Sequence, residues 1–220
     1  MPYRRTENVV RRLAARHNAI IVAARQAVSE GGVAAVQIAP VARRAGIATG
    51  TVYRYFPAKT DLLRALFAEI AERELAALDR AAAVAPGPLS ALAAAIMTFA
   101  TRALRDRRLT FAAIAEPIDA GLDPAQLSFR KSLAAEFSTR IAAAIAGGHL
   151  PAQDAALAGV ALLGLLIEAL LGPLAPDCTG RERDVVQSLT LLVLRALGVA
   201  DARARGLVVQ TALPADAASP

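Results

Sequence analysis

The sequence predicts an all-α fold in which a three-helix helix-turn-helix domain precedes a larger helical domain. Apolar residues make up 55% of the 220 residues, yet aromatic residues make up only 4% and Trp is absent. Much of the apolar content is therefore alanine, which favours helices and buries little area. Glycine and proline separate segments whose apolar residues recur every three to four positions. We expect helices over residues 8–30, 37–45, 48–56, 61–83, 88–105, 109–116, 124–146, 152–171 and 181–197.

The first helix is indicated by Ile20, Ala24 and Val28, which recur at a spacing of four before two glycines end the run. Residues 2–6 ahead of it are expected to form a loose basic arm, because chain termini are seldom ordered.

The next two helices are short and lie close together in the sequence. Apolar residues of segment 37–45 share one helical face, and Gly46 then supplies the permissive conformation that often ends a helix. A connection of about three to four residues leads to segment 48–56, which Pro57 ends. Two short helices joined in this way form a helix-turn-helix.

Segment 48–56 has an apolar side and a polar side. At about 100° per residue, Ala48, Val52 and Phe56 gather on one side. The residues that face away or lie on the flanks are Gly50, Thr51, Tyr53 and Arg54. Hydroxyl, phenol and guanidinium groups are those that proteins place on DNA phosphates and base edges. This side is therefore a candidate nucleic-acid surface.

The long helix over 61–83, with Thr60 as its expected N-cap, leaves the head and enters the larger domain. A continuous helix of this kind can convey a shift from body to head. Residues from about 200 onward show no clear period and end in PADAASP, so we expect a weakly ordered tail.

The charge of the chain is concentrated in its first part. Residues 1–64 hold 11 Lys and Arg against three Asp and Glu, a net charge of +8, whereas the rest holds 14 against 16, a net charge of −2. A basic module on a near-neutral body is typical of a nucleic-acid binder. A general enrichment in arginine would explain the count but not its distribution.

Other features favour a cytoplasmic protein without catalytic chemistry. Cys178 is the only cysteine, which suits a reducing compartment, and the first residues lack the apolar core of a signal peptide. Segment 155–171 is shorter than the ~20 residues of a membrane span and contains Glu168, so it is expected to be a buried or interface helix. His17 and His149 have no neighbours at metal-ligand spacing. We predict no enzyme activity, cofactor or metal site.

Spaced residues over the first third of the chain resemble the amino-terminal domain of TetR-family transcriptional regulators. They are Ile20, Ala23, Ala24, Gly31, Val41, Ala42, Ala45, Gly46, Gly50 to Phe56, Lys59, Leu62 and Leu63. The resemblance implies a homodimeric regulator, most simply a repressor, that binds a double-stranded DNA operator and is released by a small apolar effector. It divides the chain into a helix-turn-helix DNA-binding domain (1–60), a ligand-binding and dimerisation domain (61–199) and the tail (200–220).

The resemblance also implies contact residues. It assigns phosphate contacts to Tyr53 and Lys59, and base or backbone contacts to Thr49, Gly50, Thr51 and Arg54. Further candidates for DNA contact are Arg44, Tyr55 and the arm residues Arg4 and Arg5, although Tyr55 can instead belong to the core. Gln37 and Ala48 depart from the family pattern, because each stands where a Ser or Thr commonly caps a helix. Each departure loses a cap worth about 1 kcal/mol.

Two regions of the larger domain are assigned in the same way. Four of the six phenylalanines lie between residues 99 and 137, where the resemblance implies an apolar effector cavity lined by Met97, Phe99, Phe111, Ile114, Glu116, Phe129 and Phe137. Two nearly apolar helix faces favour a four-helix homodimer interface through Leu157, Ala161, Gly164, Leu165, Glu168, Val185, Leu189 and Leu192. Ordinary internal packing is the alternative for both sets.

A second function class stays open at the level of sequence. The chain could be a helical small-molecule-binding protein or enzyme whose basic head meets RNA or an anionic membrane. A gel shift against the promoter DNA beside its own gene distinguishes the two, because specific retention with a steep salt dependence favours the regulator.

Overall fold

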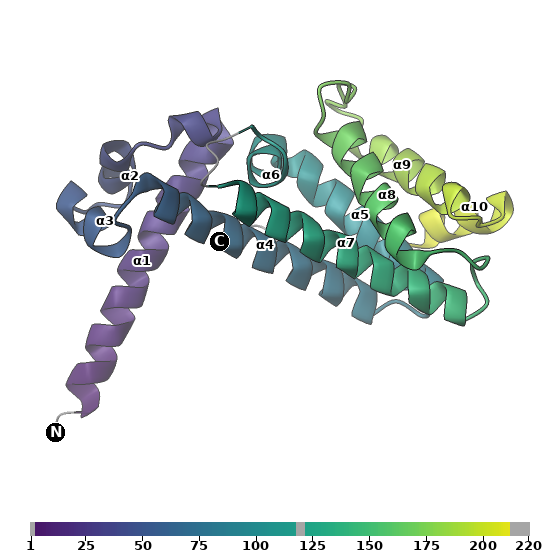
Figure 1. The fold of residues 1–220 in the computed structure, drawn as a ribbon, viewed down its shortest axis with the longest axis horizontal. Coiled ribbons are helices and arrows are strands. Elements are labelled where there is room, and N and C mark those ends of the chain that lie inside the picture. The colour runs from purple at the N-terminus through teal and green to yellow at the C-terminus, as the bar shows by residue number, and fades with distance from the viewer. Residues whose placement is uncertain (1–2, 118–121, 212–220) are drawn as a thin grey trace.

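The computed structural model describes residues 3–117 and 122–211, with the side chains of the first helix placed from residue 8 onward. Within these residues every regular element is helical, which confirms the all-α prediction (Figure 1). The elements are α1 (Tyr3–Gly31), a 3-10 turn (Val33–Ala35), α2 (Ile38–Arg44), α3 (Thr49–Tyr55), α4 (Lys59–Ala83), α5 (Pro88–Arg105), α6 (Arg107–Ile114), α7 (Asp123–Ala146), α8 (Ala155–Leu170), α9 (Glu182–Ala196) and α10 (Asp201–Gln210).

Helices α1, α2 and α3 form a small head at one end of the molecule, and α4 runs from it into the body (Figure 1). The head packs around apolar side chains at the helical spacing that the sequence shows, supplemented by the first turns of α4. These buried residues include Ile20, Ala24, Val28, Val36, Val41, Val52, Phe56, Leu62 and Leu66. The head and the start of α4 therefore share one core.

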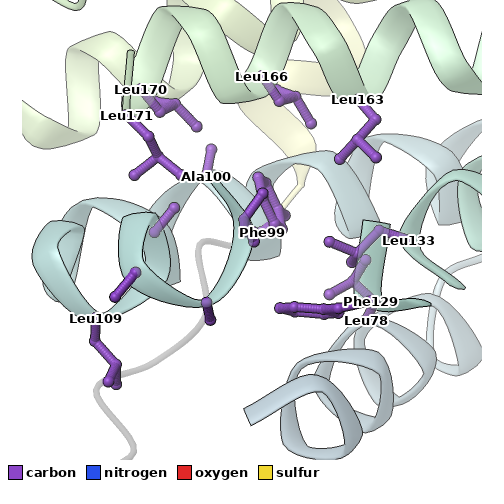
Figure 2. Close-up of a cluster of buried hydrophobic side chains, with 14 of the residues drawn as sticks. Leu78, Phe99, Ala100, Leu109, Phe129, Leu133, Leu163, Leu166, Leu170 and Leu171 are labelled. Carbon is purple, nitrogen blue, oxygen red and sulfur yellow. The ribbon is translucent and has the colours of Figure 1, made fainter. Parts of the chain in front are cut away.

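The body is built around α5, which packs against α4, α7, α8 and α9. Figure 2 shows Phe99 of α5 between leucines of α8 and the α7 residues Phe129 and Leu133. The rings of Phe99 and Phe137 meet edge to face, with centroids 6.2 Å apart. The candidate effector region is thus part of the main apolar core of the body.

Helices α7 and α8 cross with little space between them at Gly159. A Cβ added to Gly159 would lie 2.1 Å from Ser138 Oγ and 2.9 Å from both Ala134 O and Ser138 N. Only a glycine fits at this crossing without movement of the α7 backbone.

A polar pair fastens α4 to α5 inside the body. Arg102 Nε donates a hydrogen bond of 2.7 Å to Glu74 Oε2. The other carboxylate oxygen, Glu74 Oε1, is buried and has no hydrogen-bond partner among the described residues. Burial raises the pKa of Glu74, against the lowering effect of Arg102. The charged form of the Glu74 carboxylate is therefore less stable at the α4–α5 contact than it would be in water.

The structure corrects the expectations for both ends of the chain. The prediction of a loose arm over residues 2–6 is wrong from Tyr3 onward, because α1 already begins at Tyr3. The prediction of a weakly ordered tail from residue 200 is also wrong in part, because residues 201–210 form α10. This helix packs on α9, and its Ala204 and Val208 are buried. An alternation of Arg with small residues hid this helix from a search for apolar periods. Residues 212–220 and Pro2 lie outside the described residues.

Two helix starts also differ from the sequence prediction. Helix α4 begins at Lys59 and not after Thr60, and its first turn is closed by Asp61, which accepts a hydrogen bond of 3.1 Å from Ala58 N. Helix α8 begins at Ala155 because Asp154 caps it, accepting hydrogen bonds from Ala156 N and Leu157 N. None of the described helices is long and apolar enough to cross a membrane.

Candidate nucleic-acid interface

Helices α2 and α3 meet in the predicted helix-turn-helix. Gly46 lies between them with φ of 67°, in the left-handed region that favours glycine. Buried Val41 and Val52 hold the two helices against the head core. Neither Gln37 nor Ala48 makes a side-chain cap in the described part of the chain, as expected from the sequence. Burial of the apolar side therefore orients α3, despite its uncapped first turn.

The outer side of α3 is exposed. Tyr53 is 50% exposed, Thr49, Gly50 and Arg54 are exposed, and Thr51 is half-buried. The structure thus brings these five predicted contact residues together on one short helix. Lys59 lies half-buried at the start of α4, a few residues beyond.

Gly50 has no evident role in packing within the chain. A Cβ added to it would meet no described atom within 4 Å, and its φ does not lie in the left-handed region. Glycine inside a helix costs about 1 kcal/mol relative to alanine. Contacts within the chain do not explain a glycine at this position. A partner whose backbone approaches α3 closely would explain it.

Two of the predicted DNA-contact residues, Tyr55 and Arg44, contact other residues of their own chain. Tyr55 packs against the core with its hydroxyl buried and without a partner among the described residues, which favours the core alternative over a DNA contact. Arg44 pairs with Glu30 of α1 through both terminal nitrogens. This pairing lowers the pKa of Glu30 and raises that of Arg44. A phosphate would have to compete with Glu30 for Arg44.

Arg4 and Arg5 belong to the first turns of α1, and their side chains lie outside the described part of the structure. Sequence reasoning also missed His17 of α1. Its ring packs on Phe56 and Tyr55, with centroids 5.1 Å and 6.3 Å apart respectively. Its position three residues before Ile20, on the same helical face, was the available signal. His17 joins α1 to the end of α3.

Helix α6 of the body is tied to the head at both ends. Ser29 Oγ of α1 donates a hydrogen bond of 2.6 Å to Asp106 Oδ2, while Asp106 Oδ1 caps α6 by accepting from Leu109 N at 3.1 Å. Beyond the other end, Glu116 Oε2 accepts from Val33 N at 3.2 Å. We call these two contacts the α6 clamp.

The clamp places the carboxylate of Glu116, a predicted effector residue, against the head. A Cβ on Gly32 would lie 2.9 Å from Glu116 Oε1. Gly32 has φ of 71°, so the turn after α1 also requires glycine for its backbone. Gln126 of α7 holds the same segment by donating to Glu116 O at 3.0 Å.

The other predicted effector residues belong to the body interior. Phe111 is half-buried in α6, while the remaining five are buried. These five are Met97, Phe99, Ile114, Phe129 and Phe137.

The predicted dimer residues divide between surface and core. Leu157, at 68% exposure, and Leu192, at 53%, lie on an apolar surface together with exposed Ala161, Gly164 and Glu168. Leu165 and Val185 are half-buried beside it. Leu189 is only 7% exposed and packs into the core of its own chain, which favours the internal-packing alternative for this residue.

The chain is similar in sequence to known regulators over its head. The family described as "Bacterial regulatory proteins, tetR family" matches residues 20–66. The HTH-type transcriptional repressor KstR of Mycolicibacterium smegmatis is 47% identical over 64 residues, which are 29% of this chain and 31% of that protein. KstR of Rhodococcus jostii is 44% identical over 85 residues, which are 37% of this chain and 38% of that protein. The matched segments span about a third of the length of these relatives.

Similarity to solved structures extends over head and body. RolR in complex with the ligand resorcinol is 27% identical, with a TM-score of 0.65 over 93% of this chain and 98% of that chain. The transcriptional regulator FadR from Bacillus subtilis, in complex with stearoyl-CoA, is 23% identical, with a TM-score of 0.68 over 83% of this chain and 97% of that chain. The fatty acid degradation regulator FadR from Bacillus halodurans, at 23% identity, has a TM-score of 0.74 over 84% and 97% of the two chains. The two FadR structures share the fold of this chain.

Proposed function

We propose that the chain is a TetR-family regulator, a homodimeric, DNA-binding transcriptional repressor of the cytoplasm, because residues 20–66 match the family of bacterial regulatory proteins described as tetR. The observation that carries this proposal is the outer side of α3, where exposed hydroxyl, phenol and guanidinium groups surround a glycine that packing does not require. Residues 1–60 are the DNA-binding domain, and residues 61–199 bind ligand and dimerise. Helix α10, packed on α9, extends this second domain to residue 210.

Binding to the promoter DNA beside the protein's own gene tests the proposal. Specific retention of this DNA over unrelated DNA, with an affinity that falls steeply between two salt concentrations, supports a regulator. Equal retention of promoter DNA, unrelated DNA and RNA supports the alternative of a helical binding protein with a general affinity for nucleic acid. Retention on anionic vesicles without binding to DNA supports the membrane alternative.

The contact residues of α3 and α4 are expected to differ in what they contribute. Tyr53→Ala and Lys59→Ala each remove a phosphate contact, so each lowers affinity for every DNA sequence by about 1.5 kcal/mol. Thr51→Ala removes a contact near a base edge. It is expected to change the difference in binding free energy between the preferred base pair and its alternatives by about 1 kcal/mol. Fluorescence anisotropy with promoter DNA and single-base variants measures both effects. If all three variants bind as the wild type does, the contact surface lies elsewhere.

We place the dimer interface on the exposed apolar surface of α8 and α9. Leu157, Val160 and Leu192 are more than half exposed in the single chain, and adjoining small residues allow a second pair of helices to approach closely. Two-fold symmetry then sets the two α3 helices about 34 to 36 Å apart, one turn of the DNA helix.

Leu157→Glu is expected to convert the dimer to a monomer, because the interface would bury an unpaired carboxylate. Sedimentation velocity measures the change in mass. Val84→Glu is the matched control, since Val84 is 85% exposed at the end of α4 and lies outside the proposed interface. A Leu157→Glu protein that sediments as the wild type does would place the interface on another surface.

We also propose that a small apolar effector binds among α5, α7 and α8. The buried side chains of Phe99, Phe129 and Leu163 present only carbon atoms to this region (Figure 2), and an apolar lining selects apolar ligands. Resorcinol in RolR and stearoyl-CoA in the FadR from Bacillus subtilis are examples of ligands bound by proteins of this fold. Effector binding that shifts α6 relative to α4 would be transmitted to the head through the α6 clamp.

A further inference from the structure

A buried carboxylate interrupts the apolar side of α4. The residues one and two helical turns from Glu74 on this side are Phe67, Ile70 and Leu78, which belong to the main core or pack against it. Helical spacing therefore predicts an apolar residue at position 74. The chain instead has a glutamate there that is only 9% exposed. Burying a carboxylate costs free energy unless both of its oxygens are hydrogen-bonded, so packing alone does not explain this residue.

The bond to Arg102 accounts for only one oxygen of this carboxylate. Arg102 Nε donates to Glu74 Oε2 at 2.7 Å, while Glu74 Oε1 is buried without a partner among the described residues. An arginine can satisfy both oxygens of a carboxylate in a bidentate pair, and Arg102 does not do so here. Glu74 Oε1 is therefore an acceptor that no described group of the chain uses.

The Glu74–Arg102 pair lies next to the apolar region proposed for the effector. On α4, Glu74 is one helical turn from Leu78, and on α5, Arg102 is about one turn from Phe99. Figure 2 shows Leu78 and Phe99 in the same apolar cluster, together with Phe129 of α7. Two helices thus independently place the pair at the edge of this region. A ligand bound there can reach the buried acceptor.

The charge of the pair favours a neutral hydrogen-bond donor. Arg102 already offsets the negative charge of Glu74, so a second cation would lose its hydration for little electrostatic gain. A hydroxyl or N–H group satisfies the acceptor without adding charge. A hydrogen bond to an ionised acceptor is also stronger than one between neutral groups.

We propose that Glu74 is a specificity-determining residue of the effector site, which accepts a hydrogen bond from a neutral hydroxyl or N–H group on an otherwise apolar ligand. This inference rests on the proposed function, and it adds the chemical class of the effector and the residue that selects it. An apolar molecule of the same size without a donor leaves Glu74 Oε1 unsatisfied and binds less tightly.

Isothermal titration calorimetry of the full-length protein with matched probes tests this assignment. The probes are two pairs of equal size, m-cresol with m-xylene and 1-octanol with methyl heptyl ether. Only the first member of each pair donates a hydrogen bond, and the two pairs differ in shape. In the wild type, we expect the donor of at least one pair to bind about tenfold more tightly than its partner, or better.

Two substitutions of Glu74 remove the ionised acceptor in different ways. Glu74→Gln keeps the shape, and its amide oxygen can still accept from Arg102, which turns an NH₂ group toward the ligand. The preference for the donor should then fall to about threefold or less, because the charged acceptor is lost. Glu74→Leu makes this side of α4 apolar throughout, so m-xylene and methyl heptyl ether should bind at least as tightly as their partners.

Glu136→Gln is the matched control. Glu136 is also a partly buried carboxylate bonded to an arginine, Arg140, which links α7 to Asp79 of α4. This variant should keep the preference of the wild type for the donor probes.

The possible failures are distinguishable. A donor preference of wild-type size in both Glu74 variants would overturn the assignment, because another group would be the acceptor. Equal binding of donor and non-donor probes by the wild type would also overturn it, while leaving a purely apolar effector site in place. Failure of all four probes to bind would overturn both the assignment and the proposed effector region. Specific retention of promoter DNA, measured without probes, reports separately on the proposed regulator.

Discussion

Gly159→Ala is expected to lower the free energy of unfolding by about 2 to 3 kcal/mol, as overpacking in a close helix crossing does. The added methyl would lie 2.9 Å from the backbone atoms Ala134 O and Ser138 N, so α7 and α8 must separate to admit it. This cost exceeds the gain of about 1 kcal/mol that alanine brings inside a helix. Urea unfolding followed by circular dichroism measures the difference.

Two further variants isolate the cause of that effect. Gly206→Ala in α10 is the matched control, because its Cβ would meet no described atom within 4 Å and it should be neutral or stabilising by up to about 1 kcal/mol. Adding Ser138→Ala to Gly159→Ala removes only the clash at 2.1 Å with the hydroxyl, so it should restore a minor part of the loss. A Gly159→Ala protein as stable as the wild type would mean that α7 and α8 do not cross closely.

Asp106→Ala is expected to cost about 2 kcal/mol of stability. One part is the N-cap of α6, worth about 1 kcal/mol. The other is the hydrogen bond from Ser29 Oγ, which is charge-assisted and joins head to body. The same change should raise amide hydrogen exchange around the turn after α1, because one end of the α6 clamp is released.

Asp154→Ala provides the matched comparison for the clamp. Asp154 also caps a helix, accepting from Ala156 N and Leu157 N, and both of these hydrogen bonds lie at the start of α8. Its replacement should cost about 1 kcal/mol and leave exchange in the head unchanged. Equal losses for Asp106→Ala and Asp154→Ala would mean that the bond to Ser29 contributes nothing to stability.

The sequence predicted those parts of the fold that depend on local signals. Gly46, Pro57 and the apolar residues spaced along α1 predicted the helix-turn-helix, because turn geometry and helical periodicity follow from neighbouring residues. Helix α10 was missed since its fully buried residues are only Ala204 and Val208, with Leu207 partly buried beside them, which is too short a pattern to identify.

The candidate site was predictable where it depends on one helix and not where it depends on distant partners. The exposed side of α3 follows from its helical period. By contrast, Arg44 bonds Glu30, which is 14 residues away in the sequence, and Glu116 bonds Val33, which is 83 residues away. A sequence does not indicate which of several carboxylates such groups will reach. Glu116 was grouped with the phenylalanines near it in the chain, whereas tertiary packing directs its carboxylate to the head.

DNA cleavage from the start of α3 tests the central claim most directly. Ala48 is exposed at the N-cap of α3, and Ala48→Cys can carry an iron chelate that cuts nearby DNA, with buried Cys178 replaced by Ser. The account predicts two clusters of cuts in the promoter DNA, separated by about 10 base pairs or 34 to 36 Å. If the protein binds the promoter DNA but the cuts are spread evenly along it, the claim that α3 enters the major groove at two fixed positions is contradicted.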